Sequence, residues 1–131
     1  MKKYILVDIN RLRTHERTSK RRVNQVQKKI KDLSMVKNPV VADRKTLIVL
    51  DGHHRLAALK RLGAKKIPVL VVNYLSKNVR VYLRRKNLLV AIIKQAVINM
   101  ALDNKNFPEK TTRHLIKNRL KNINIAIKQL R

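Results

Sequence analysis

Apolar positions in the first half of the chain follow two different periods. A short apolar run over residues 3–7 predicts a strand. From about Ser19 to Leu33, apolar residues recur at helical spacing with Lys and Arg between them, which predicts an amphipathic helix with Ser19 as its N-cap. Two further strands are predicted, one after Pro39 and one over 46–50, joined by a tight turn.

The second half repeats this alternation of helices and strands. Leucines at helical spacing predict a helix of about ten residues that ends at Gly63, where a left-handed cap favours glycine. The continuous apolar run over 67–72 predicts a buried strand, and the alternating residues 79–83 predict an edge strand. A second long amphipathic helix is predicted over 87–102, and the tail over 122–130 is apolar enough to dock on the body of the protein.

The order of these elements is β-α-β-β-α-β-β-α. It predicts the α/β class, as a small mixed-sheet domain with a C-terminal helical extension. The length of 131 residues fits one domain over 1–131. We expect its core over about 4–83 and a C-terminal segment, a helix followed by a polar motif, over about 86–131.

Composition narrows the class of protein further. Hydrophobic residues make up 44% of the chain, so we expect a folded protein, and the absence of cysteine excludes disulfides and thiolate metal sites. The first apolar run is too short for a signal peptide, and the longest apolar stretch is interrupted by polar residues and too short for a bilayer. These features predict a soluble cytoplasmic protein with no membrane partner.

Charge is the extreme feature of the sequence. Thirty-three Lys and Arg residues against seven acids give a net charge of +26, which attracts polyanions and makes non-specific nucleic-acid binding one expectation. The alternative is a solvated basic coat, because the cations are spread along the whole chain. Aromatic residues form only 3% of the chain, which argues against a stacking platform for single strands. The sequence leaves both alternatives open, and it leaves the oligomeric state open as well.

The stretch "LDGHHRLAALKRLG" joins a predicted strand to a predicted helix and contains both glycines of the chain. A helix start exposes unpaired N–H groups, and Gly52 lets the backbone approach an anion closely. His53, His54 and Arg55 add donors suited to phosphate oxygens. The alternative is structural: Asp51 caps the helix, Gly52 makes the turn, and the histidines are incidental.

The other two histidines also occur in short polar motifs. His15 precedes Glu16 in "RTHERT", and His114 follows Thr112 and Arg113 in "TTRHL". We expect each motif in a loop or at a helix start. Glu16 could be an ion-pair partner of the arginines around it, or a general base for phosphoryl transfer to a hydroxyl. A zinc site is disfavoured, because adjacent histidines are poorly placed to ligate one metal.

The stretch "LDGHHRLAALKRLG", preceded by "KNPVV", resembles the ParB/sulfiredoxin superfamily, and the resemblance covers roughly residues 4–125. The Gly-His-His-Arg form, with "HE" near the start and "TTRH" near the end, is most similar to the archaeal free serine kinases. The resemblance implies a ParB/sulfiredoxin-like fold and an ADP-dependent kinase. Such a kinase phosphorylates free L-serine to O-phospho-L-serine with release of AMP, in cysteine biosynthesis.

The resemblance also implies roles for the residues that match its motifs. Glu16 would be the catalytic carboxylate, with His15 beside it to orient it. Phosphates of ADP would bind the two runs that share the family pattern: Asp51, Gly52, His53, His54 and Arg55, and Thr112, Arg113 and His114. Mg²⁺ would be held mainly by the phosphates, with Asp51 as the candidate protein ligand. The alternative function is a ParB-like nucleotide- and DNA-binding regulatory module without kinase activity.

Overall fold

Strand β5 (Lys66–Val72) lies at the centre of the first sheet because apolar side chains occupy both of its faces. It pairs antiparallel with β1 (Ile5–Asp8) and parallel with β3 (Val40–Asp43), and β4 (Val49–Asp51) continues the sheet beyond β3. The strand order is β1-β5-β3-β4. The computed structural model describes residues 4–85, 88–91, 94–108 and 112–131.

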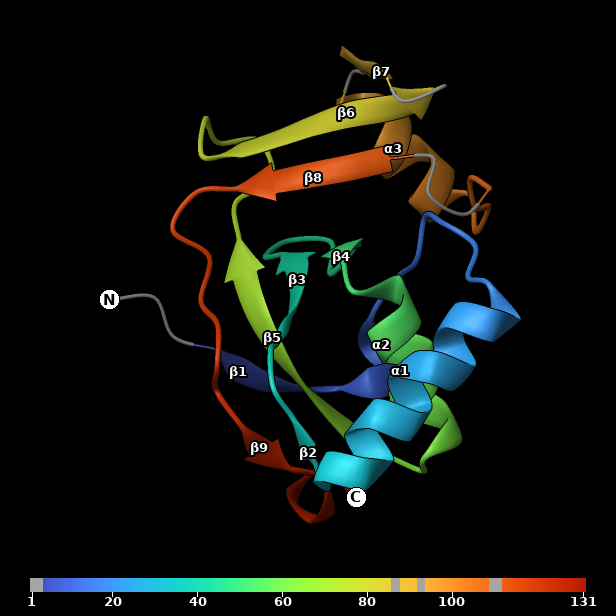
Figure 1. Ribbon diagram of the computed structural model, residues 1–131. Helices are drawn as coiled ribbons and strands as arrows, with labels where there is room; N and C mark the ends of the chain where they lie inside the picture. The colour runs from blue at the N-terminus through green and yellow to red at the C-terminus, as the bar shows by residue number, and fades with distance from the viewer. Residues whose placement is uncertain (1–3, 86–87, 92–93, 109–111) are drawn as a thin grey trace.

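Two helices, α1 (Lys20–Leu33) and α2 (His53–Arg61), cover one face of this sheet (Figure 1). The Ser19 side chain accepts a hydrogen bond from the Arg22 backbone N–H, which confirms Ser19 as the N-cap of α1. Gly63 follows α2 with φ +78°, the left-handed conformation that the sequence predicted for it. Buried residues of the two helices and the inner sheet face form the first core, which includes Val23, Ile30, Val40, Leu56, Leu59, Ile67 and Val69.

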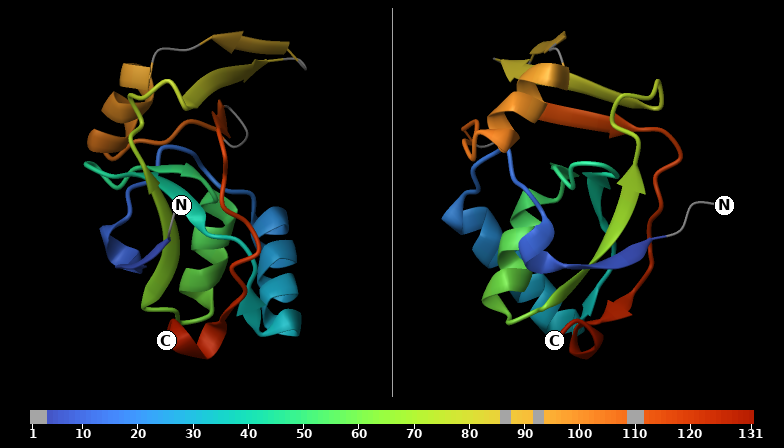
Figure 2. Two further views of the ribbon diagram at one scale, coloured as in Figure 1. Left: turned by 90° about the vertical axis from the view of Figure 1, so that its left-hand side faces the viewer. Right: turned by 180° about the vertical axis from the view of Figure 1, so that it is seen from behind.

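A second sheet packs on the other side of the first one. Its strands are β6 (Val79–Arg85), β7 (Leu88–Ala91) and β8 (Thr112–Ile116), in the antiparallel order β7-β6-β8, and α3 (Lys94–Leu102) packs beside them (Figures 1 and 2). The second core lies between the sheets and includes Val41, Ile48, Leu50, Leu70, Tyr74, Val79, Val81, Val97 and Ala101.

The C-terminal tail docks on the body of the protein, as the sequence predicted. Its short strand β9 (Ile125–Ala126) pairs with β2 (Met35–Val36), and η2 (Ile127–Gln129) follows, just as η1 (Ile9–Arg11) follows β1. The Leu130 side chain is fully buried, and its carbonyl accepts hydrogen bonds from the backbone of Lys65 and Lys66. The tail therefore closes the end of the first core.

The α/β class with a mixed sheet is confirmed, but three local predictions are wrong. Residues 88–91 form a strand instead of the start of a helix, and α3 begins only at Lys94. The other residues at the start of that predicted helix, Asn87, Ile92 and Ile93, lie outside the described residues. The run over 79–83, predicted as an edge, is the central strand of the second sheet. A short apolar run fits a helix turn or a strand equally well, and only pairing decides between them.

The third wrong prediction concerns the C-terminal polar motif. Residues 112–116 form strand β8 instead of a loop or helix start. Strand alternation therefore turns Thr112 and His114 inward, where both are buried, and leaves Arg113 exposed. No helix in the described residues is both long enough and apolar enough to span a bilayer.

Candidate active site

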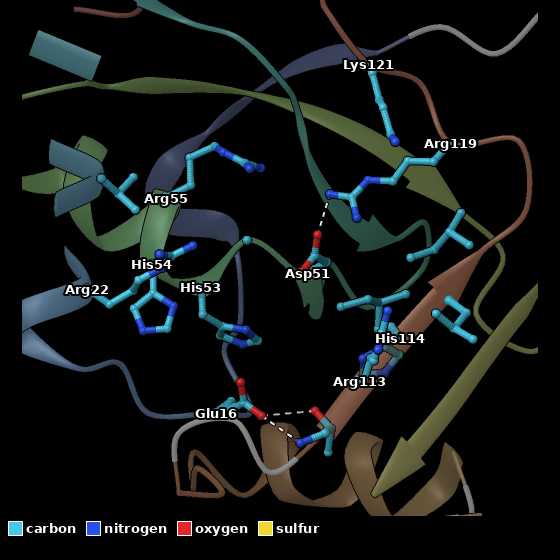
Figure 3. A pocket seen from close by; sticks show the side chains of 16 residues that line it. Glu16, Arg22, Asp51, His53, His54, Arg55, Arg113, His114, Arg119 and Lys121 are labelled. Atoms are coloured by element: carbon cyan, nitrogen blue, oxygen red, sulfur yellow. Dashed lines mark hydrogen bonds and ion pairs between the residues drawn. The ribbon is translucent and has the colours of Figure 1, made fainter. Parts of the chain in front are cut away.

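A cavity of about 460 Å³ opens between the first turn of α2, the start of α1 and strand β8 (Figure 3). It gathers residues from all three polar motifs, although these are far apart in the sequence. The predicted site residues that line it are Glu16, Asp51, Gly52, His53, His54, Arg55, Thr112, Arg113 and His114. The remaining one, His15, is fully buried behind them.

The turn between β4 and α2 requires glycine for two reasons. Gly52 has φ +106°, which L side chains rarely adopt, and it is the N-cap of α2 without a side-chain cap bond. A Cβ atom at this position would lie 2.6 Å from Cγ1 of Val40, which is buried in the first core. Gly52 thus brings the start of α2 and its N–H groups to the pocket, while its backbone packs directly on the core.

His53 and His54 both accept hydrogen bonds from the loop that carries Glu16. The His15 backbone N–H donates to Nε2 of His53, and the Ser19 backbone N–H donates to Nε2 of His54, each at 3.2 Å. Burial lowers the pKa of His53 well below its usual value, and the neighbouring imidazoles of His15, His114 and His54 lower it further. His53 is therefore neutral at pH 7, with its hydrogen on Nδ1, and offers phosphate a donor but no charge.

Glu16 is held by the polar motif of β8. Its Oε1 accepts hydrogen bonds from the Thr112 backbone N–H at 2.9 Å and from the Thr112 hydroxyl at 3.1 Å (Figure 3). The loop around Glu16 is also fixed by backbone bonds to Phe107, whose N–H donates to the His15 carbonyl and whose carbonyl accepts from Arg17. Thr112 holds the carboxylate of Glu16, and Phe107 holds the backbone on either side of Glu16, so the side chain keeps one orientation in the pocket.

His15 supports this arrangement from behind. Its Nε2 lies 3.0 Å from the Thr112 hydroxyl oxygen, and since that hydroxyl donates to Glu16, the neutral His15 ring donates through Nε2–H. The ring packs edge-on against His53 and His114, with centroids 4.6 and 5.4 Å away. Burial lowers the pKa of His15 to about 4, and the Val49 backbone, which would accept from the charged ring, offsets this only in part.

His114 joins the pocket to a residue that the sequence analysis missed. Its Nε2 lies 2.9 Å from the hydroxyl of Tyr74, which is fully buried beyond the end of β5. Burial lowers the pKa of His114 to about 3, with smaller contributions from His15 and Lys94. Burial likewise raises the pKa of the Tyr74 phenol. No spacing in the sequence connects Tyr74 to the "TTRHL" motif, because β5 and β8 come together only in three dimensions.

Cations and a few apolar residues form the rest of the pocket lining. Among the described residues, the cationic side chains that line it beside the carboxylates of Glu16 and Asp51 are Arg22, Arg55, Arg113, Arg119 and Lys121. Arg22, Arg119 and Lys121 were not predicted; the only sequence signal for the last two is their closeness to the "TTRH" motif. Nη1 of Arg55 donates to the Pro39 carbonyl at 3.1 Å.

Asp51 does not cap α2, so the structural alternative for this residue is wrong. Gly52 is the N-cap, and the Asp51 carboxylate forms an ion pair with the Arg119 guanidinium (Figure 3). This pair joins the end of β4 to the segment that follows β8. It also lies beside Arg55, whose pKa is lowered by burial while Asp51 acts to raise it.

The pocket suits a metal ion that arrives with phosphates better than a metal held by protein ligands alone. The described residues contain no group of three or more His, Cys, Asp or Glu side chains placed to hold a metal. One partly exposed carboxylate, Asp51, adjoins the cationic wall. A single carboxylate beside a phosphate site is a donor set that Mg²⁺ accepts, since it takes most of its other ligands from phosphate and water.

Comparison with known proteins gives the family. The model of the ParB N-terminal domain matches residues 4–88, and the chain belongs to this family. An ATP-dependent L-serine kinase of Staphylothermus marinus is 36% identical over 81 residues, covering 58% of this chain and 32% of that protein. The ADP-dependent L-serine kinase of Thermococcus kodakarensis is 26% identical over 83 residues, covering 60% and 34%. The matched region thus spans about a third of the length of these relatives.

Solved structures agree on the fold over almost the whole chain. A free serine kinase in complex with AMP superposes with a TM-score of 0.87, covering 98% of this chain and 94% of the other at 15% identity. A mutant free serine kinase in complex with ADP gives the same TM-score and coverage at 14% identity. At this level of identity the likeness establishes the shared fold, including α3 and β8, which lie beyond the family match.

Proposed function

We propose that this chain is a kinase that transfers a phosphoryl group from a nucleotide to the hydroxyl of free L-serine. The observation that carries the proposal is the position of Glu16, a carboxylate held by Thr112 at the edge of a pocket lined by five cations. Such a pocket combines a proton acceptor with a phosphate site, the two parts that transfer to a hydroxyl requires. We take free L-serine as the acceptor because the relatives are named L-serine kinases.

In the proposed reaction with ADP, the serine hydroxyl oxygen attacks the β-phosphorus. The bond from that phosphorus to the bridging oxygen breaks, AMP leaves, and O-phospho-L-serine forms. Glu16 accepts the proton of the hydroxyl. Thr112 holds the carboxylate in position, and His15 in turn holds the Thr112 hydroxyl.

The phosphates would lie over the Gly52 turn. There the N–H groups at the start of α2 and the exposed Arg113 donate to phosphate oxygens, and Arg55 contributes charge from the pocket wall. Fixed donors and cations stabilise the charge on the transferring group, which is the main task in phosphoryl transfer. His53 and His54 serve as neutral donors through Nδ1–H and as anchors of the Glu16 loop.

Asp51 would be the protein ligand of Mg²⁺, and the bound ion would neutralise phosphate charge. The Asp51 carboxylate is paired with Arg119. Phosphate oxygens offer Arg119 an alternative partner, so nucleotide binding would release Asp51 toward the metal. The Arg119 guanidinium thereby serves both the carboxylate and the phosphates.

The motif resemblance favours ADP as the donor, whereas the relatives at 36% and 37% identity are named ATP-dependent. The test is incubation of the purified protein with Mg²⁺, L-serine and either ADP or ATP, followed by detection of O-phosphoserine. Formation of AMP or of ADP identifies the donor. A protein that binds nucleotide but makes no phosphoserine with either donor would instead be the ParB-like regulatory module, which membership of the ParB N-terminal domain family also favours.

A further inference from the structure

Acidic residues are almost absent from the second half of the chain. No Asp or Glu occurs from Gly52 to Leu102, and only Asp103 and Glu109 follow, whereas Lys and Arg continue throughout. The cations of residues 52–102 therefore have no acidic neighbour in this part of the sequence.

The turn from β5 into β6 lies beside the end of β8 (Figures 1 and 2). Residues of these segments line two adjoining hollows. The larger, of about 590 Å³, is lined by Lys77, Asn78, Arg80, Leu115, Ile116 and Lys117. The smaller, of about 380 Å³, includes Arg44 and shares Asn78 and Ile116 with the larger. The surface is rigidly framed, because Val79 pairs with Ile116 and the Lys117 N–H donates to the Asn78 carbonyl at 2.9 Å.

The lining of these hollows differs from that of the candidate active site. Their cations Arg44, Lys77, Arg80 and Lys117 have exposed side chains, and no carboxylate of the described residues lines either hollow. The active-site pocket, by contrast, contains Glu16 and Asp51. Among the residues whose side chains the structure describes, no aromatic ring lines the two hollows. The surface therefore suits a ligand with repeated negative charges.

We propose that this surface, the hollows around Lys77, Arg80 and Lys117, binds the sugar-phosphate backbone of nucleic acid without preference for base sequence. A polyanion fits it because successive phosphates can contact several neighbouring cations at once and release counterions. The inference goes beyond the kinase and does not depend on it, since none of these cations lines the active-site pocket.

The test compares two charge-reversal variants of equal charge change in the full-length protein. One carries Lys77→Glu, Arg80→Glu and Lys117→Glu. The matched control carries Lys20→Glu, Arg21→Glu and Lys31→Glu on the exposed face of α1. Affinity for a short DNA duplex and for the RNA duplex of the same sequence is measured across a salt titration, with and without saturating ADP.

We expect the first variant to lose far more affinity than the control, and its slope of log affinity against log salt to shrink by roughly two to three. ADP should displace neither duplex from the wild-type protein. The comparison of the DNA duplex with the RNA duplex shows which backbone the surface prefers. Equal losses in both variants would make the charge a diffuse coat and overturn the proposal. Displacement by ADP would also overturn it, because the nucleic acid would then occupy the active-site pocket. Serine phosphorylation is scored separately, so failure of the kinase proposal would leave these results unaffected.

Discussion

The Thr112 backbone N–H and hydroxyl both donate to the same oxygen of Glu16, although the two residues are 96 positions apart in the sequence. Glu16 lies in a loop beside the first sheet, and Thr112 begins the last strand of the second sheet. The pair therefore joins the two sheets at the edge of the pocket. It also fixes the carboxylate that the proposed reaction uses as a base.

Thr112→Val should slow phosphoryl transfer without abolishing it. Valine keeps the backbone N–H and the shape of the side chain, but it removes one donor from Glu16 and the partner of His15 Nε2. A carboxylate held less firmly should lower kcat by about ten- to a hundred-fold, with nucleotide affinity nearly unchanged. The measurement is steady-state kinetics of O-phosphoserine formation.

Thr46→Val is the matched control for this substitution. The Thr46 hydroxyl donates to Asp43 at 2.7 Å, in a turn whose residues do not line the pocket. It should lower the free energy of unfolding and leave kcat unchanged. A loss of kcat in the control as large as in Thr112→Val would mean that Thr112 acts on stability alone.

Stability should fall as the pH drops from 7 toward 4. Burial holds the pKa of His15 at about 4 and that of His114 at about 3, against 6.5 for exposed histidine. Between these values the unfolded chain binds protons that the folded protein does not, so the free energy of unfolding decreases with falling pH. Chemical denaturation at a series of pH values measures this slope.

His114→Phe tests whether the histidines cause this slope. Phenylalanine keeps a ring in the buried position and removes one titrating group. The variant should be less stable at neutral pH, because the Tyr74 hydroxyl loses its partner, but its stability should depend less steeply on pH by about one proton. An unchanged slope would show that His114 does not titrate in this range.

Gly52→Ala should destabilise the fold more than Gly63→Ala. Both glycines have positive φ, so both substitutions strain the backbone, at a cost of about 1–3 kcal/mol. Only at Gly52 does the added Cβ meet a neighbour, Cγ1 of Val40 at 2.6 Å, whereas at Gly63 nothing lies within 4 Å. Thermal unfolding of both variants measures the difference. Equal losses would mean that the contact with Val40 relaxes without cost.

The sequence predicted the parts of the fold that local pattern determines. The helix from Lys20, its Ser19 cap, the buried strand β5 and the glycine after α2 follow from periodicity and capping alone. Residues 88–91 could not be assigned in this way, because their pairing with β6 is a contact between strands. The same limit applies to the pocket: Arg119 and Tyr74 carry no motif, and only packing brings them to Asp51 and His114.

The structure brings the histidine motifs together around one pocket, and burial changes their chemistry. A sequence shows that His53, His54 and Arg55 are neighbours, but it does not show that His53 is buried. Burial makes His53 neutral and leaves the positive charge of the pocket to arginine and lysine. Whether a histidine is a cation or a neutral donor depends on desolvation, which follows from the tertiary structure.

The measurement that tests the central claim most directly is the rate of O-phosphoserine formation by the wild-type protein and by Glu16→Gln, with Mg²⁺, L-serine and the preferred nucleotide. Glutamine keeps an oxygen for the Thr112 donors and removes the base. The account predicts that the wild type makes phosphoserine and that Glu16→Gln is slower by about 10²–10⁴ with nearly unchanged nucleotide affinity. Equal rates in the two proteins would contradict it, as would wild-type protein that binds the nucleotide and makes no phosphoserine.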